Sequence, residues 1–336
     1  MKKTINFLCL TFISNIKLIL VNIVILFLLF EISSRLYLSL RRESKFLDPS
    51  RVTEFYYPEL KSSRKNPTTQ TEHHILLLGA SVLNPSWGTV EEEIRNALKE
   101  VTTKPFVIHN MGMPSHTSRD SLIKYKLLKG NHFDKVLVYH GINEIRMNNY
   151  SENRYKHDYS HIHWYRIVDP ITQYPELSYY ATPFMIQHTW FKLTTRDNDQ
   201  EFENKKYGSK IKTAISLSSN LNAIADIAKA RHENLILCTF ATHIPPNYSQ
   251  EQFNDHKLDY DKHLLPVEAW GFAENVKKTM SVHNKVIQGV AKAQGVTCID
   301  FATLIPKSKA TFDDPCHLTN QGSRIFARSI VSELLP

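Results

Sequence analysis

Short apolar runs of strand length alternate with longer helical stretches from about residue 73 of this 336-residue chain onward. The first run, residues 75–79, reads Ile-Leu-Leu-Leu-Gly and passes at once into a turn of small residues, as expected where a buried strand ends abruptly. Strands separated by helices favour one parallel sheet, because the helices can then cover both of its faces. The predicted strands are 75–79, 106–109, 135–140, 235–240 and 296–299, and the predicted helices are 90–100, 118–128, 211–231, 273–294 and 320–334.

This order of elements predicts an α/β fold with a doubly wound, five-stranded parallel sheet. In such sheets a ligand site lies at the carboxyl ends of the strands, near a point where the strand order reverses. We therefore look for chemistry in the residues that directly follow each predicted strand.

An apolar segment covers residues 16–32 and predicts a transmembrane helix, since about 20 apolar residues span a bilayer. A cleaved signal peptide is the main alternative, but the residues that follow contain no Ala-x-Ala-like cleavage site. A buried or surface helix is the other alternative. We expect three parts: a membrane anchor with a basic flank (1–45), a polar tether without helix or strand pattern (46–72), and a folded domain (73–336).

The net charge of +8 is concentrated near the apolar segment. Residues 1–45 hold seven Lys/Arg and two Asp/Glu, so they carry +5, and the other 291 residues carry only +3. Anionic lipid headgroups are thus a better partner than nucleic acid, which we do not expect to bind. The Lys/Arg balance across the segment does not decide its orientation. We expect a single-pass protein whose folded domain lies on the extracytoplasmic side, in the periplasm or cell envelope.

Ser81 ends the turn after the first predicted strand, where Gly79 and Ala80 leave room for a substrate. A nucleophilic serine needs a base and a group that orients this base. Asp314 and His317 lie three residues apart in a loop before the last predicted helix and suit these two roles. The alternatives are a packing turn at Ser81 and an ordinary helix-start turn at Asp314.

Two further strand ends offer hydrogen-bond donors for an oxyanion. The backbone N–H of Gly112 follows the second predicted strand, and the side chain of Asn143 follows the third. Glycine and asparagine are also common in ordinary turns, which is the alternative reading. The order of Ser81, Gly112 and Asn143 on successive strands, with Asp314 and His317 after the fifth, favours one shared site.

This set of residues resembles the blocks of the SGNH/GDSL hydrolase superfamily. Gly79-Ala-Ser81, Asn110-Met-Gly112, Gly141-Ile-Asn143-Glu144 and Asp314-Pro-Cys-His317 occur in the family's order, with Ala80 and Glu144 where Asp is more usual. The resemblance covers residues 73–334. It implies a flavodoxin-like sheet and a serine hydrolase with Ser81 as nucleophile, His317 as base and Asp314 as its orienting partner. The oxyanion hole would then consist of the Ser81 N–H, the Gly112 N–H and the Asn143 side chain.

Other side chains are assigned weaker roles. An insertion rich in aromatic residues and histidine (about 147–210) is expected to fold over the edge that carries Ser81, either as a pocket wall or as a packed cap. Cys316 is expected to point away from the His317 ring. We expect no cofactor. We also expect no metal site, because His157 and His161 are four residues apart but the residues around them show no helical apolar pattern. The possible pocket residues are Trp87, Glu144 and His243.

The function that we predict is a membrane-anchored esterase that acts through an acyl-enzyme on a small-molecule, glycan or lipid ester, for example an O-acyl ester of an envelope glycan or lipid. An O-acyltransferase that passes the acyl group to a sugar hydroxyl would use the same residues. A third alternative, from a different class, is a glycan-binding or scaffolding module without catalytic activity.

Overall fold

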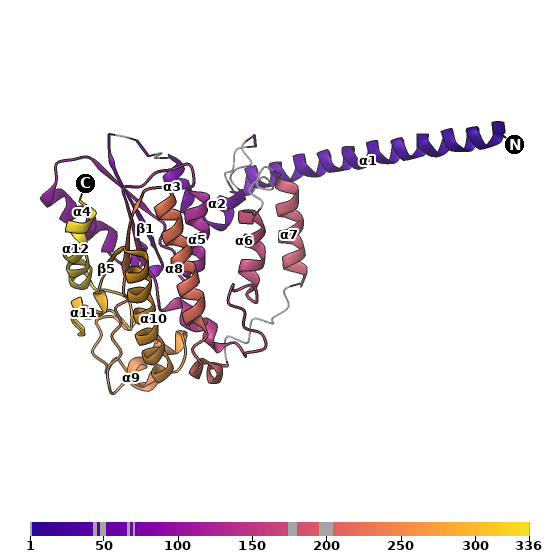
Figure 1. Cartoon of the computed structure of the whole chain (residues 1–336). Helices are drawn as coiled ribbons and strands as arrows, with labels where there is room; N and C mark the ends of the chain where they lie inside the picture. Colours follow the sequence, from indigo (N-terminus) through magenta and orange to yellow (C-terminus); the bar gives the residue numbers. More distant parts are fainter. Residues whose placement is uncertain are drawn as a thin grey trace. The chain divides into compact units, whose positions relative to one another are not determined.

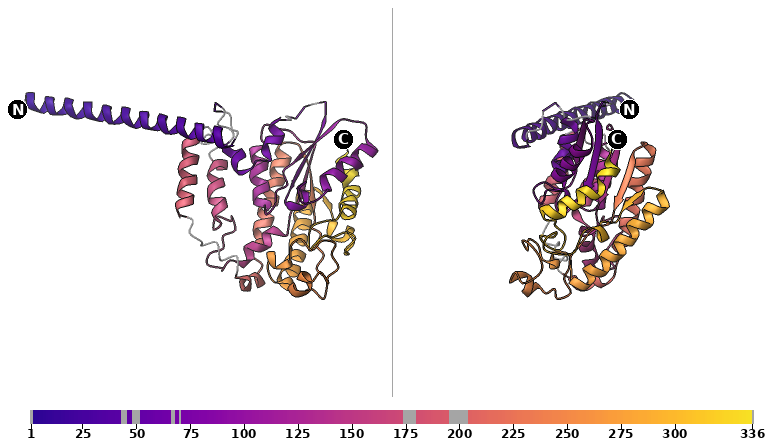
Figure 2. Two further views of the ribbon diagram at one scale, coloured as in Figure 1. Left: turned by 180° about the vertical axis from the view of Figure 1, so that it is seen from behind. Right: turned by 90° about the vertical axis from the view of Figure 1, so that its left-hand side faces the viewer.

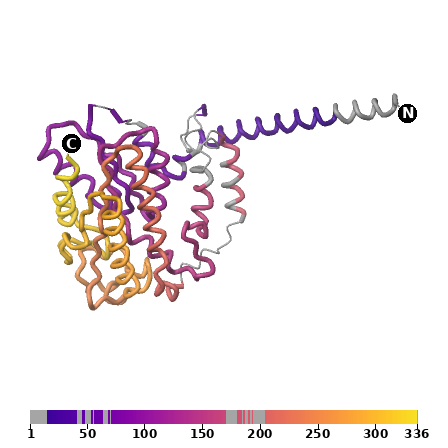
Figure 3. The backbone as a smooth tube through the Cα atoms, viewed as in Figure 1, coloured from indigo at the N-terminus to yellow at the C-terminus, as the bar shows by residue number. Residues whose placement is uncertain are grey.

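A computed structural model describes residues 2–42, 46–47, 52–65, 68–69, 71–173, 180–194 and 204–335 (Figure 1). Within these residues the chain divides into two compact units. Residues 59–166 and 198–336 form the unit that contains the sheet, and residues 1–58 and 167–197 form the other. In the sequence, residues 167–197 therefore stand between the two parts of the sheet unit, and the colours of Figure 3 follow this order along the backbone.

The sheet has five parallel strands in the order β2-β1-β3-β4-β5. The order reverses at β1, so β1 and β3 lie next to each other at the centre, as in flavodoxin-like folds. All seven residues of β1 are buried. The strands are β1 (His73–Gly79), β2 (Phe106–Asn110), β3 (Lys135–Tyr139), β4 (Asn234–Cys238) and β5 (Thr297–Ile299).

Helices cover both faces of this sheet (Figure 2). On one side α4 packs against α12, and on the other α8 packs between α5 and α10. Successive side chains of a strand point to opposite faces of the sheet. Ile75 and Leu77 belong to the core under α4 and α12, so Leu76 and Leu78 are buried on the opposite face. The helices are α4 (Val90–Val101), α5 (Ser118–Leu127), α8 (Thr213–Ala230), α10 (Ala273–Gln294), α11 (Phe301–Leu304) and α12 (Asn320–Leu334).

The predicted fold class is confirmed. Two of the five main helices, α10 and α12, have the predicted bounds, whereas β4 ends at Cys238 rather than at residue 240. Short helical segments fill the connections: η2 (Ser81–Leu83), η3 (Asn143–Asn149), η6 (Lys205–Ser209), α9 (Gln250–Asn254) and η7 (Val267–Ala269).

The expectation of a tether without secondary structure in residues 46–72 is wrong where the structure describes this stretch. It contains α2 (Val52–Tyr56) and α3 (Leu60–Lys65). Ser63 on α3 is buried and bonds through its hydroxyl to Nδ1 of His109 on β2, 3.0 Å away. The sheet unit thus begins before residue 73, because α3 packs on the edge strand.

The other unit consists mainly of α1 (Lys2–Arg42) and α7 (Ala181–Thr194), and α6 (His163–Gln173) runs from the sheet unit into it. The part of α1 from Asn15 to Leu40 is long and apolar enough to cross a membrane. The predicted insertion 147–210 is divided accordingly: residues 167–197 group with α1, and residues 147–166 stay with the sheet. Its residues 174–179 and 195–203 lie outside the described part.

Candidate active site

Ser81 lies two residues beyond the end of β1 and begins the short helix η2. The turn can be this tight because Gly79 has no side chain: a Cβ atom there would lie 2.5 Å from Leu83 Cδ1 and 3.1 Å from the Tyr139 carbonyl oxygen. The first N–H groups of a helix have no hydrogen-bond acceptor within that helix. Ser81 is the first residue of η2, so its backbone N–H can donate to a group outside the helix. Ser81 itself is 9% exposed.

His317 comes to Ser81 from the loop before α12. Its Nε2 lies 2.8 Å from Ser81 Oγ, and its Nδ1 lies 2.7 Å from Asp314 Oδ2. A carboxylate accepts the Nδ1–H, which leaves Nε2 as the acceptor for the Ser81 hydroxyl proton. The three side chains predicted from the sequence are therefore joined in one hydrogen-bonded chain.

The Asp314 carboxylate is fixed by backbone donors. Oδ1 accepts from the N–H groups of Cys316 (2.9 Å) and His317 (2.8 Å), and Oδ2 also accepts from Leu265 N–H (3.1 Å). Asp314 is fully buried, so these bonds replace the water that would otherwise stabilise its negative charge. The carboxylate is held in a single orientation toward the imidazole.

The loop that carries Asp314 and His317 is pinned at both ends. Phe312 and Leu318 form an isolated antiparallel bridge, and Asp313 N–H donates to His317 O at 2.9 Å. Thr319 then caps α12 by accepting from Gly322 N–H at 3.1 Å. The backbone of this loop is thus set by the same residues that start the last helix.

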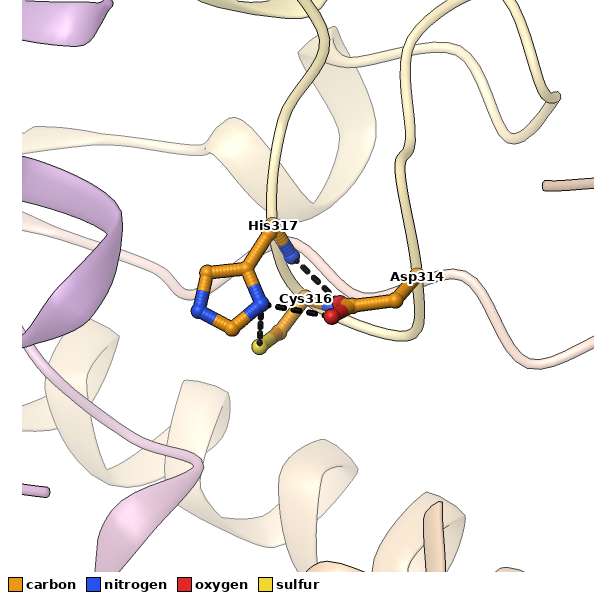
Figure 4. A group of neighbouring side chains, drawn as sticks. All are labelled: Asp314, Cys316 and His317. Atoms are coloured by element: carbon orange, nitrogen blue, oxygen red, sulfur yellow. Dashed lines mark hydrogen bonds and ion pairs between the residues drawn. The ribbon is translucent and has the colours of Figure 1, made fainter. Parts of the chain in front are cut away.

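Cys316 departs from the expectation. Its Sγ lies 3.6 Å from His317 Nδ1, so the thiol is beside the imidazole rather than turned away from it (Figure 4). Figure 4 also shows that Nε2 faces away from both Cys316 and Asp314. Burial raises the pKa of this thiol well above its ordinary value, which keeps the sulfur protonated and unsuited to nucleophilic attack.

Asp314, Cys316 and His317 also form a group that could in principle hold a metal ion, with ligand atoms within 4.8 Å of one another. The donor chemistry does not fit a metal. The Asp314 oxygens already accept four hydrogen bonds, and the lone pair that a metal would need at His317 Nδ1 is replaced by the proton shared with Asp314.

Trp87 lies over the imidazole. Its ring stacks on His317 with the centroids 4.8 Å apart and the planes inclined by 25°. This predicted pocket residue is half-buried and therefore shields one face of the His317 imidazole from water. The backbone N–H of Trp87 donates to the Asn84 carbonyl, and this turn holds Trp87 close to the end of η2.

Asn143 is held by two partners that decide which way its amide points. Trp270 Nε1–H donates to Asn143 Oδ1 at 3.0 Å, and Asn143 Nδ2 donates to the His116 carbonyl at 2.9 Å. An indole N–H can only donate, so the oxygen must face Trp270 and the amino group must face the other way. One N–H of that amino group is left for a further acceptor.

Gly112 is brought next to the nucleophile turn, but its N–H is already engaged. It donates to Asn110 Oδ1 at 2.7 Å. A Cβ atom at this position would lie 3.0 Å from the Ala80 carbonyl oxygen, which shows how closely the two turns approach. The Asn110 amide is itself tied to the Leu83 carbonyl at 2.6 Å and to Glu91.

The other two predicted pocket residues are built into the surroundings of the site. Glu144 is fully buried, accepts from Ser118 N–H, and has a pKa raised to about 7 by burial. His243 is 8% exposed: its N–H bonds to the Pro315 carbonyl at 3.0 Å and its Nε2 to the Asp259 carbonyl at 3.1 Å. His243 therefore supports the loop of Asp314.

Sequence reasoning did not assign a site role to Trp270 or Asn110. Trp270 is separated from Asn143 by 127 positions, and no local pattern links the two. Asn110 was part of the motif around Gly112, but nothing in the motif indicates that its side chain would occupy the Gly112 N–H.

Comparison with known proteins gives structural neighbours only. No family model and no curated protein matches the sequence. The chain is similar to a lipase/acylhydrolase from Enterococcus faecalis (TM-score 0.41, 15% identity, 78% of this chain and 95% of that one). It is also similar to a GDSL-like lipase from Bacteroides thetaiotaomicron (0.44, 13%, 85% and 98%) and to an acetylxylan esterase from Geobacillus stearothermophilus (0.43, 13%, 79% and 96%). At identities of 15% and below, we base the functional argument on this chain's own residues.

Proposed function

We propose that this protein is a serine ester hydrolase of the SGNH/GDSL type. The observation that carries the proposal is the unbroken chain from Ser81 Oγ through both ring nitrogens of His317 to Asp314, with steps of 2.8 and 2.7 Å. A hydroxyl, an imidazole and a buried carboxylate in this order are the parts that activate a serine nucleophile.

In the first half-reaction, Ser81 Oγ forms a bond to the ester carbonyl carbon while its proton passes to His317 Nε2. The carbonyl electron pair moves onto oxygen. When the tetrahedral intermediate collapses, the ester C–O bond breaks and the alcohol leaves with the proton from Nε2. In the second half-reaction, water gives a proton to Nε2 while its oxygen forms a bond to the acyl carbon. The bond between that carbon and Ser81 Oγ then breaks, Nε2 returns the proton to Oγ, and the acid is released. Asp314 stabilises the imidazolium in both halves.

The oxyanion would be bound by the Ser81 N–H and the free N–H of the Asn143 amide. The Gly112 N–H would join them only after it leaves Asn110 Oδ1, to which it is bonded at 2.7 Å. We therefore assign the stronger role to Asn143, whose orientation is already fixed by Trp270.

The apolar part of α1, Asn15–Leu40, would anchor the protein in a membrane. An enzyme held there meets esters of lipids or of surface glycans, and we propose an O-acyl ester of an envelope glycan or lipid as the substrate. The sheet unit would then act on the extracytoplasmic side.

A fluorophosphonate probe tests the nucleophile. We expect the full-length protein to be labelled and S81A to remain unlabelled. S86A is the matched control, because Ser86 is an exposed serine on the same turn, and it should be labelled like the wild type. Labelling of S81A at the wild-type rate would refute the assignment of Ser81.

Product analysis separates hydrolysis from transfer. With an acetylated substrate and an excess of a glycan acceptor, we expect free acetate to be the main product by mass spectrometry. Faster formation of an acetylated glycan would instead identify an O-acyltransferase that uses the same three residues.

A further inference from the structure

The unit formed by α1 and α7 carries a buried carboxylate inside the apolar helix. Glu31 is 8% exposed and accepts hydrogen bonds from Ala181 N–H (2.9 Å), Thr182 N–H (2.8 Å) and Thr182 Oγ1 (2.8 Å). It also accepts from Arg35 Nε at 2.6 Å. Glu31 therefore caps the start of α7 from another helix, supplying a negative charge where the helix dipole and the free N–H groups favour one.

This capping has a consequence for α1. A charged residue within an apolar span is unfavourable unless it has partners. Besides Arg35 on the same helix, the partners of Glu31 are Ala181 and Thr182, which lie 150 and 151 residues further along the chain. The ring of Phe27 also meets Tyr180 edge-on, with the centroids 6.1 Å apart. The bonds from α7 to Glu31 favour an apolar helix that stays in the protein over a signal segment that is removed.

One face of α7 is apolar and uncovered. Ile186, Trp190 and Leu193 have the i, i+4, i+7 spacing of a single helix face and are 57%, 69% and 75% exposed. Together with Leu26 and Phe30 of α1 they line a groove of about 580 Å³ between the two helices. The uncovered face of α7 therefore continues into the exposed apolar surface of α1, where Leu18–Phe30 carries no charged residue.

The two helices do not run alongside each other. Figures 1 and 2 show α7 leaving α1 at a steep angle, starting at the level of Glu31. If the uncharged run Leu18–Phe30 of α1 occupies the hydrocarbon core of the bilayer, α7 starts at the end of that run and lies close to the plane of the membrane surface. Tyr180 and Trp190 are the residue types enriched at this depth.

We propose that α7 is an interfacial helix whose Ile186–Trp190–Leu193 face is covered by lipid acyl chains, and that Glu31 of the anchor fixes its depth. The inference rests on the membrane anchor named in the proposed function. It gives the protein a second contact with the bilayer, made by a segment inserted between two parts of the sheet unit.

Tryptophan quenching by brominated lipid tests this inference. The full-length protein would be reconstituted into phosphatidylcholine vesicles, with or without acyl chains brominated near the headgroup, and co-flotation with the vesicles would be measured in parallel. Trp190 is one of four tryptophans. We expect quenching in the wild type and in the control W164F, whose tryptophan lies in the sheet unit, and its loss in W190F. Equal quenching in the wild type and W190F, or none at all in protein that floats, would overturn the role of α7.

The Glu31 cap is tested in the same assay. E31A removes the acceptor for three α7 donors, so we expect Trp190 quenching to fall by half or more while the protein still floats through α1. E31Q keeps one acceptor oxygen and should give an intermediate result. Unchanged quenching in E31A would show that Glu31 does not set the depth of α7. Failure of the wild type to float would refute the anchor and, with it, this inference, but it would leave probe labelling of Ser81 unaffected.

Discussion

Trp270 donates its indole N–H to the side-chain oxygen of Asn143 at 3.0 Å. Trp270 is 1% exposed, so no water can replace this donor without a cavity first opening. The amide of the proposed oxyanion donor is thus oriented by a residue that lies 127 positions away. In the contacts that the structure describes, Trp270 touches neither Ser81 nor His317.

This relationship predicts a specific defect in W270F. Loss of the indole N–H frees the Asn143 amide to rotate, so kcat should fall roughly 10-fold to 100-fold with little change in KM, as for an interaction made only in the transition state. Steady-state kinetics on a chromogenic ester checks this. N143A should cause at least as large a loss, and the double variant should be little worse than N143A alone. Additive losses would contradict the coupling.

The Asp314–His317 contact predicts that D314N is nearly inactive although it folds. An asparagine can present its amino group to Nδ1, which favours the tautomer with the proton on Nε2 and deprives Ser81 of its acceptor. We expect kcat/KM to fall by roughly 10³-fold to 10⁴-fold, by analogy with the loss of activity that the same change causes in the triad of a serine protease. Circular dichroism should show an intact fold. Activity within 10-fold of the wild type would exclude Asp314 as the orienting partner.

The stacking of Trp87 on His317 predicts different outcomes for two substitutions. W87F keeps an aromatic ring over the imidazole and should retain most of the activity. W87A exposes that face to water and loosens the ring, so kcat/KM should fall by about 10-fold or more. Both variants would be measured on esters with short and long acyl chains. Equal activity of W87A and the wild type on all of them would show that the stacking has no functional role.

The buried Glu144 predicts a pH-dependent difference in stability. Its pKa is raised to about 7, mainly by burial, so the folded protein keeps a proton that the unfolded chain loses above pH 4.5. The stabilising contribution is therefore present below pH 4.5 and is lost as the pH rises through 7. E144Q is neutral at every pH and keeps an acceptor for Ser118 N–H.

We accordingly expect E144Q to melt at about the wild-type temperature at pH 5 and to melt higher than the wild type at pH 8, by about 2 °C or more. Thermal unfolding followed at both pH values checks this. A lower melting temperature of E144Q at pH 8 would mean that the ionised carboxylate has a partner that stabilises it.

Most of the sheet could be predicted because its strands are local features. Residues 75–79 are apolar throughout, and a central parallel strand buried on both faces has this composition. Helices α2 and α3 were not predicted, since each is about one turn or slightly longer and carries no repeating apolar pattern. These two helices depend on tertiary contacts, such as the hydrogen bond between Ser63 of α3 and His109 of β2.

The site divides in the same way. Ser81, Asp314 and His317 stand in short local patterns, and the sheet topology then brings them together. The direction of the Cys316 thiol was predicted wrongly, because it depends on the backbone of a loop held by Asp313, Phe312 and Leu318. Trp270, which orients Asn143, and the α7 residues that Glu31 caps lie more than 100 positions away from these side chains, and a single sequence gives no signal for such pairs.

The hydrogen bond between Ser81 and His317 joins residues that are 236 positions apart. Every strand of the sheet precedes, in the sequence, the loop that supplies His317. During synthesis, the strands can therefore assemble while Ser81 still has no base. If Ser81 and His317 have the proposed roles, the chain becomes able to react only when its last helix docks and brings the loop into place. A nascent chain that has already formed its full sheet would not react with the fluorophosphonate probe. The onset of labelling at Ser81 would therefore mark the completion of folding.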